Sequence, residues 1–70
     1  ADYANVEPLL RRDLSIREKR WGTKSVSLVP ALRNLANCLI LQGRVGNESD
    51  SLMARAEAIL AEVPPEQRKI

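Results

Sequence analysis

The sequence repeats itself imperfectly with a period of 43 residues, and this repeat limits the possible folds more than any other feature. Five residues return with the same or a similar side chain: Glu7, Leu9, Leu10, Arg12 and Ile16 become Asp50, Leu52, Met53, Arg55 and Ile59. Apolar residues inside each copy follow spacings of three, four and seven, as on the side of a helix. A period of this length is typical of stacked helical repeats rather than of a closed globule.

Proline and glycine set the ends of three predicted helices, at about 5–21, 28–42 and 48–63. Asn5 is the expected N-cap of the first helix, which puts Pro8 at the third helical position, where its missing N–H costs little. Gly22 can end that helix in a left-handed conformation.

The second helix is expected to begin after Ser27, because Pro30 is tolerated only in the first turn. A start at Ser25 would leave Pro30 as a kink, and Gly43 ends the helix. Asn47 is the expected cap of the third helix, with Asp50 completing a short capping box. Two prolines at 64–65 end it, and the charged tail 66–70 is expected to be loose.

Each predicted helix carries an apolar face that should be buried. In the first helix this face is a broad band of Val6, Leu9, Leu10, Leu14, Ile16, the stem of Arg17, and Trp21. In the second it is Leu28, Leu32, Leu35 and Leu39, beside the small Ala36. In the third it is Leu52, Met53, Ala56, Ile59, Leu60 and Val63. Since no alternating apolar pattern indicates a strand, the predicted fold class is all-α.

Composition excludes several kinds of partner. The 70 residues suffice for one small domain, and the net charge is only +2. Basic residues from Arg11 to Lys24 interleave with Glu7, Asp13 and Glu18, so we expect a solvated helix face and no nucleic-acid binding. The longest uncharged stretch, which contains Asn34 to Gln42, is too short to cross a bilayer, and we expect no membrane partner.

Catalytic and metal-binding patterns are missing from the sequence. It contains no histidine, no phosphate-binding glycine loop and no Cys-x-x-Cys pair. Cys38 is the single cysteine, lies in an apolar run, and is expected to be a buried thiol in a cytoplasmic protein. A helix start explains the neighbouring acids Glu48 and Asp50. We therefore expect no enzyme activity, no cofactor and no metal.

The helical segments resemble tetratricopeptide repeats of the kinesin-light-chain-like subtype, with units of about 42 residues instead of about 34. The first helix matches the second helix of such a unit at Tyr3, Glu7, Pro8, Leu9, Arg12, Leu14, Ile16, Arg17, Glu18, Lys19 and Gly22. The middle segment matches a first helix at Leu32, Asn34, Leu35, Ala36, Gln42, Gly43 and Arg44. The resemblance implies antiparallel helix hairpins of an α-solenoid.

By this alignment residues 3–22 are the second helix of one repeat, 27–63 are one full repeat, and 64–70 are a tail. The outer faces of the first and third helices would then lack their usual neighbours. We expect self-association through these apolar faces, or a place in a larger protein. Trp21 is expected to be buried rather than to be an exposed anchor, because it occupies a normally apolar repeat position.

The resemblance also implies a concave groove lined by the helix at 28–42, which would bind a protein, a peptide or a partner helix. The candidate partner-binding residues are Arg33, Asn34, Asn37 and Leu41, with Ile40 adjoining. Arginine supplies a charged donor fork for a carboxylate, and asparagine matches a peptide backbone. In the alternative, Asn34 fixes helix packing and the segment is structural, or it regulates an enzyme domain elsewhere in a longer chain. Exposure of the Arg33 and Asn37 face separates the first two possibilities.

Overall fold

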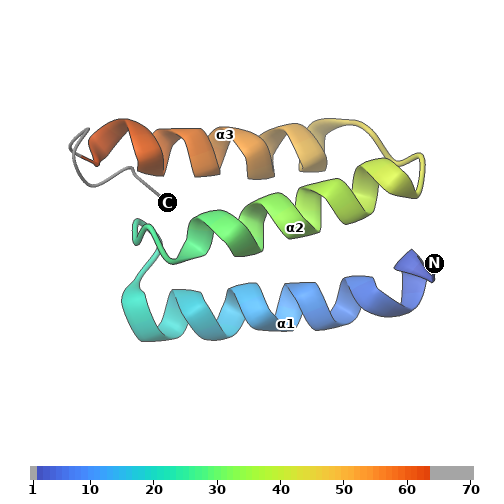
Figure 1. Ribbon diagram of the computed structural model, residues 1–70, viewed down its shortest axis with the longest axis horizontal. Coiled ribbons are helices and arrows are strands. Elements are labelled where there is room, and N and C mark those ends of the chain that lie inside the picture. Colours follow the sequence, from blue (N-terminus) through green and yellow to red (C-terminus); the bar gives the residue numbers. More distant parts are fainter. Residues whose placement is uncertain (1, 64–70) are drawn as a thin grey trace.

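The computed structural model describes residues 2–63, which contain three α-helices and no strand. The helices are α1 (Tyr3–Trp21), α2 (Leu28–Leu41) and α3 (Asn47–Glu62). Consecutive helices run in opposite directions, and α2 lies between the other two and packs against both (Figure 1). This arrangement confirms the predicted all-α fold class.

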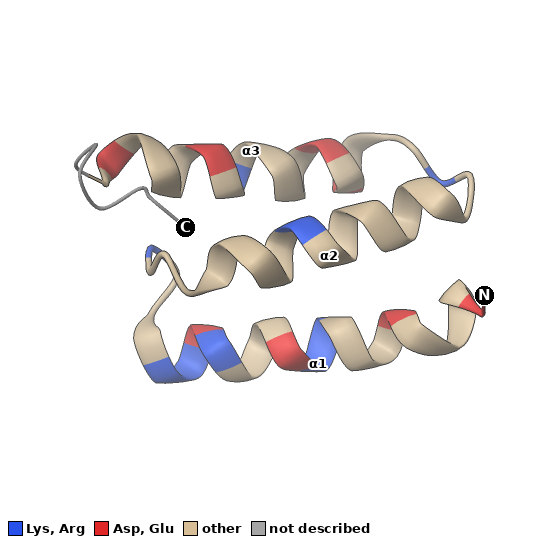
Figure 2. Ribbon diagram, in the orientation of Figure 1, with Lys and Arg blue, Asp and Glu red and all other residues tan. Residues whose placement is uncertain are grey.

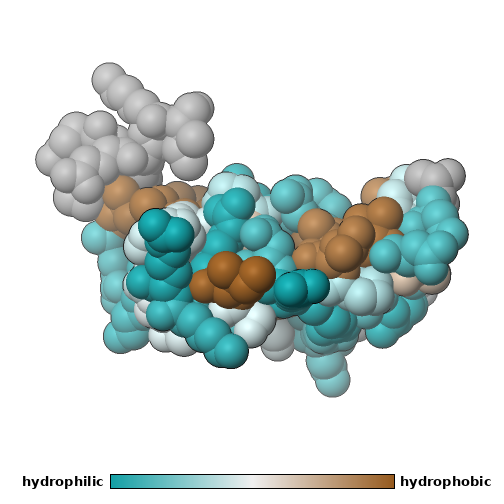
Figure 3. Space-filling view, turned by 90° about the horizontal axis from the view of Figure 1, so that it is seen from below, coloured by the Kyte–Doolittle hydropathy of each residue, from teal (hydrophilic) through white to brown (hydrophobic). Residues whose placement is uncertain are grey.

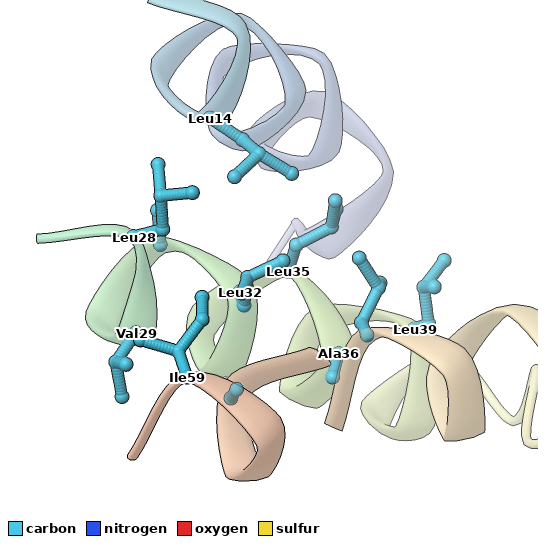
Figure 4. Close-up of a cluster of buried hydrophobic side chains, with 11 residues drawn as sticks. Leu14, Leu28, Val29, Leu32, Leu35, Ala36, Leu39 and Ile59 are labelled. Atoms are coloured by element: carbon cyan, nitrogen blue, oxygen red, sulfur yellow. The ribbon is translucent and has the colours of Figure 1, made fainter. Parts of the chain in front are cut away.

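Helix α2 supplies most of the core. Its buried residues are Leu28, Val29, Ala31, Leu32, Leu35, Ala36, Cys38 and Leu39. Leu14 points into this cluster from α1, and Ile59 meets it from α3 with Leu52 and Ala56 (Figure 4). A helix that is apolar around much of its circumference needs neighbours on more than one side, and α2 has two. The predicted leucine face of α2 is confirmed.

The start of α1 differs from the prediction. The helix begins at Tyr3, and Asp2 is its N-cap, because the Asp2 carboxylate accepts a hydrogen bond from the backbone N–H of Asn5 at 3.3 Å. Asn5 therefore lies inside the helix, and Pro8 lies beyond the first turn instead of at the third position. The predicted cap was wrong because aspartate, a better charge complement to a helix N-terminus, stands three residues earlier.

The start of α3 is also displaced by one residue. Gly46 is the N-cap and Asn47 the first helical residue. The Ser49 hydroxyl accepts from the Gly46 N–H at 3.1 Å and donates to the Gly46 carbonyl at 3.0 Å. Ser49 is thus a buried capping residue, and it takes the capping-box position that we expected for Asp50. For α2, Ser27 is the N-cap as predicted, although its side chain makes no capping bond.

Both predicted helix-ending glycines have positive φ, 83° at Gly22 and 76° at Gly43. After α2, the Gly43 N–H donates to Ile40 O and the Arg44 N–H donates to Leu39 O, both at 2.9 Å. These two bonds satisfy carbonyls at the helix end that would otherwise lack partners. The predicted proline stop and loose tail lie in 64–70, outside the described residues.

The broad apolar band predicted for α1 is mostly exposed, which corrects the sequence analysis. Leu14 is buried and Leu10 and Arg17 are partly so, whereas Val6, Leu9, Ile16 and Trp21 are exposed. The face of α1 seen in Figure 3 accordingly shows hydrophobic patches among hydrophilic side chains. The reason is geometric: α2 covers one side of α1, and no described residue covers the other.

Trp21 is half exposed instead of buried, because α1 ends at this residue and α2 leaves in another direction. Its ring lies against a cation, with the Arg20 Cζ 5.0 Å from the ring centroid. The buried stripe of α3 is confirmed at Leu52, Ala56 and Ile59, while Met53 and Leu60 are partly buried against the same core.

Ion pairs join α1 to α3 on the side of α2 where both of these helices pack. Arg11 binds Glu48 with both terminal nitrogens, at 2.7 and 2.9 Å, and Arg55 binds Glu18 at 2.6 Å. Figure 2 shows how the charged residues of α1 and α3 flank a nearly uncharged α2. These pairs fix which sides of α1 and α3 face each other.

Glu7 lies beside the Arg11–Glu48 pair and accepts hydrogen bonds from three residues. Its carboxylate accepts from Gln42 at 2.9 Å, from Arg11 at 2.9 Å and from Arg44 at 2.6 Å. The Gln42 and Arg11 hydrogen bonds hold the pKa of Glu7 below its ordinary value. The Arg11 hydrogen bonds lower the pKa of Glu48 in the same way. Glu7 therefore fastens the turn after α2 to α1.

Candidate functional site

The four predicted partner-binding residues share the exposed side of α2. Arg33, Asn34, Asn37 and Leu41 are all exposed, as is Ile40. The spacings of three and four place these side chains on one side of the helix. The opposite side holds the leucines of the core, so the candidate face is presented by the most firmly packed helix of the chain.

The polar groups of this face have no partners among residues 2–63. No hydrogen bond or ion pair engages the side chains of Arg33, Asn34 or Asn37 within that range. Arg33 is the single charged residue of α2, as Figure 2 shows. In the described part of the chain, Asn34 therefore does not fix helix packing through a hydrogen bond, which was the structural alternative for this residue.

The arrangement can recognise a mixed polar and apolar ligand. Arg33 offers a planar donor fork to a carboxylate, and Asn37 lies one turn further along the helix with a donor and an acceptor. Leu41 follows after another turn and adds apolar surface. A cation, two amides and an apolar end within three turns are suited to peptide binding rather than to bond-breaking chemistry.

A cavity of about 220 Å³ lies away from this face, so it is not the predicted groove. It is lined by Thr23, Lys24, Arg55, Ala58, Ile59 and Glu62. Sequence reasoning missed it because the connection after α1 and the last turns of α3 are far apart in the chain. No spacing rule within one element relates them, and only the packing of both on α2 brings them together.

The described residues contain no candidate metal cluster, and the cysteine among them is buried. Within 2–63, no group of three or more His, Cys, Asp and Glu side chains is placed to hold a metal ion. Cys38 is buried as predicted, and its thiol donates to the Tyr3 carbonyl at 3.3 Å. None of the helices in 2–63 is both long and apolar enough to span a membrane.

No protein-family model matches this chain, and neither a curated protein nor a solved structure matches it at a significant level.

Proposed function

We propose that the chain is a protein-interaction module that binds a peptide or a partner helix on the exposed face of α2, without catalysis of its own. The observation that carries the proposal is that Arg33, Asn34 and Asn37 are exposed on the best-packed helix and have no partner among residues 2–63. A rigid helix presents such groups with little loss of backbone entropy on binding.

The resemblance to tetratricopeptide repeats supports the same proposal, because the first helix of such a repeat lines the binding surface. Residues 28–42 correspond to that first helix, and residues 3–22 and 48–63 correspond to second helices. A cytoplasmic setting is consistent with the unpaired Cys38.

The experiment is a selection of binding peptides from a random library, followed by affinity measurements with variants. Arg33→Glu combined with Asn37→Ala should weaken binding of the selected peptides at least about tenfold. Lys24→Glu, an exposed charge reversal in the connection between α1 and α2, is the matched control and should leave the affinity unchanged. Peptides that bind both variants as well as they bind the wild type would remove the α2 face from the proposal.

A further inference from the structure

Two helix faces carry the same alternation of charged and apolar side chains, with opposite charge. On α1, intervals of three, four and three give the basic stripe, defined as Leu9, Arg12, Ile16 and Lys19. On α3, the same intervals give the acidic stripe, defined as Asp50, Met53, Glu57 and Leu60. Such intervals keep all four side chains on one side of their helix.

Both stripes are open. Every residue of the basic stripe is exposed, and so are the two acids of the acidic stripe. Met53 and Leu60 are half-buried, because only their inner sides pack on the core. None of the four charged residues makes an ion pair within 2–63.

The two stripes cannot meet each other inside one chain. Helices α1 and α3 face each other through the Arg11–Glu48 and Arg55–Glu18 pairs. Glu57 follows Arg55 by two positions, which is roughly 200° around the helix, and the acidic stripe therefore points away from α1. Arg12 follows Arg11 by one position, roughly 100° around, and the basic stripe is turned away from α3.

The stripes do match between two copies. The intervals of three, four and three read the same in both directions, so an antiparallel pairing keeps its register over all four residues. Leu9 then lies opposite Leu60, Arg12 opposite Glu57, Ile16 opposite Met53, and Lys19 opposite Asp50. Each apolar residue meets an apolar one, and each cation meets an acid.

We propose that a second copy of this chain docks its acidic stripe, antiparallel, on the basic stripe of the first. Pairing α1 with α1 would oppose bases with bases, and pairing α3 with α3 would oppose acids with acids, which electrostatic complementarity disfavours. The interface is therefore heterologous. Each associated pair keeps one open stripe at either end, and further copies can add head to tail.

Sedimentation velocity of the 70-residue chain over a concentration series tests the proposal. The average sedimentation coefficient should rise with concentration without levelling off at a dimer. Raising the salt from roughly 50 mM to roughly 500 mM should lower it, because exposed charge pairs are screened.

Charge reversal tests the register. Arg12→Glu or Glu57→Lys alone should weaken association at least about tenfold, since each opposes like charges. Arg12→Glu and Glu57→Lys in the same chain should return it to within about threefold of the wild type. Lys24→Glu and Glu62→Lys make the same net charge changes outside the stripes and should leave association unchanged. Circular dichroism checks that every variant stays helical.

Three results would overturn the proposal. A wild-type chain that sediments as a monomer at all concentrations leaves the stripes to another partner. A double variant as weak as the single ones removes the proposed register. Equal weakening by Lys24→Glu or Glu62→Lys shows that overall charge, not the stripes, controls association.

Discussion

Helices α1 and α3 are two copies of one sequence pattern, and the same positions of the repeat have opposite environments in them. Leu9 is 64% exposed and Ile16 is 54% exposed, whereas their counterparts Leu52 and Ile59 are 7% and 5% exposed. Helix α3 packs on α2 with the face that α1 leaves open. Helix α1 packs on α2 with its neighbouring face instead, through Leu14 and Leu10. A repeated pattern therefore gives each helix two faces that can pack against a neighbour. The position of the helix in the chain decides which of the two faces is covered.

The largest effect that tests this comparison is expected in the core. Ile59→Ala should lower the free energy of unfolding by about 2–4 kcal/mol, because it leaves a cavity against α2. Ile16→Ala, the same change at the counterpart position, should alter it by no more than about 0.5 kcal/mol. Urea unfolding at low protein concentration and high salt measures both without interference from association. Similar losses for the two variants would mean that the Ile16 face is covered.

A loss of stability of intermediate size is expected at acidic pH, because the Glu7 carboxylate is bound by three partners. Its folded-state pKa lies below the ordinary value of 4.5, chiefly through the Gln42 and Arg11 hydrogen bonds. The resulting stabilisation is complete above about pH 4.5 and is lost as the pH falls through the lower folded-state pKa. Glu48 contributes with the same sign.

Glu7→Gln should therefore lower the urea midpoint at neutral pH and make its decline in acid shallower. Glu57→Gln removes an exposed carboxylate that has no ion-pair partner within 2–63 and is the matched control. Its neutral-pH midpoint should stay close to that of the wild type. An unchanged acid profile in Glu7→Gln would contradict the role given to Glu7.

The smallest effect is expected at a second pair of counterparts, Arg55 and Arg12. Arg55 binds Glu18 at 2.6 Å and is half-buried, whereas Arg12 is exposed and unpaired within 2–63. Arg55→Ala should cost up to about 1 kcal/mol, the upper range for exposed ion pairs. Arg12→Ala should cost nearly nothing. Thermal melts at low and high salt measure the loss of stability in both variants. A larger loss for Arg12→Ala than for Arg55→Ala would contradict the roles given to the two arginines.

The helices themselves could be predicted closely from the sequence, because Pro30 fits only the first turn of a helix and Gly22 and Gly43 adopt the positive φ that ends one. The predicted starts of α1 and α3 were less accurate. Asp2 is the cap of α1 in place of Asn5, and Gly46 with Ser49 begins α3 in place of Asn47 with Asp50. Several residues near each start can cap, and only their geometry selects one. The burial of α2 was predictable because so few of its residues are polar.

Which face of α1 is buried could not be predicted, since Leu9, Leu10, Leu14 and Ile16 satisfy helical spacing on both faces. The choice depends on where α2 returns, which is a long-range property of the chain. The exposure of Arg33, Asn34 and Asn37 followed from the leucines opposite them on α2. Their ability to bind a partner stays a prediction.

The contact between the Cys38 thiol and the Tyr3 carbonyl has a consequence for measuring motion. The thiol is covered by the first turn of α1, so a thiol reagent can reach it only when that turn separates from α2. The rate of labelling in native conditions then counts these separations directly. Because Cys38 is the only cysteine, one reaction reports how often the cover over this thiol opens.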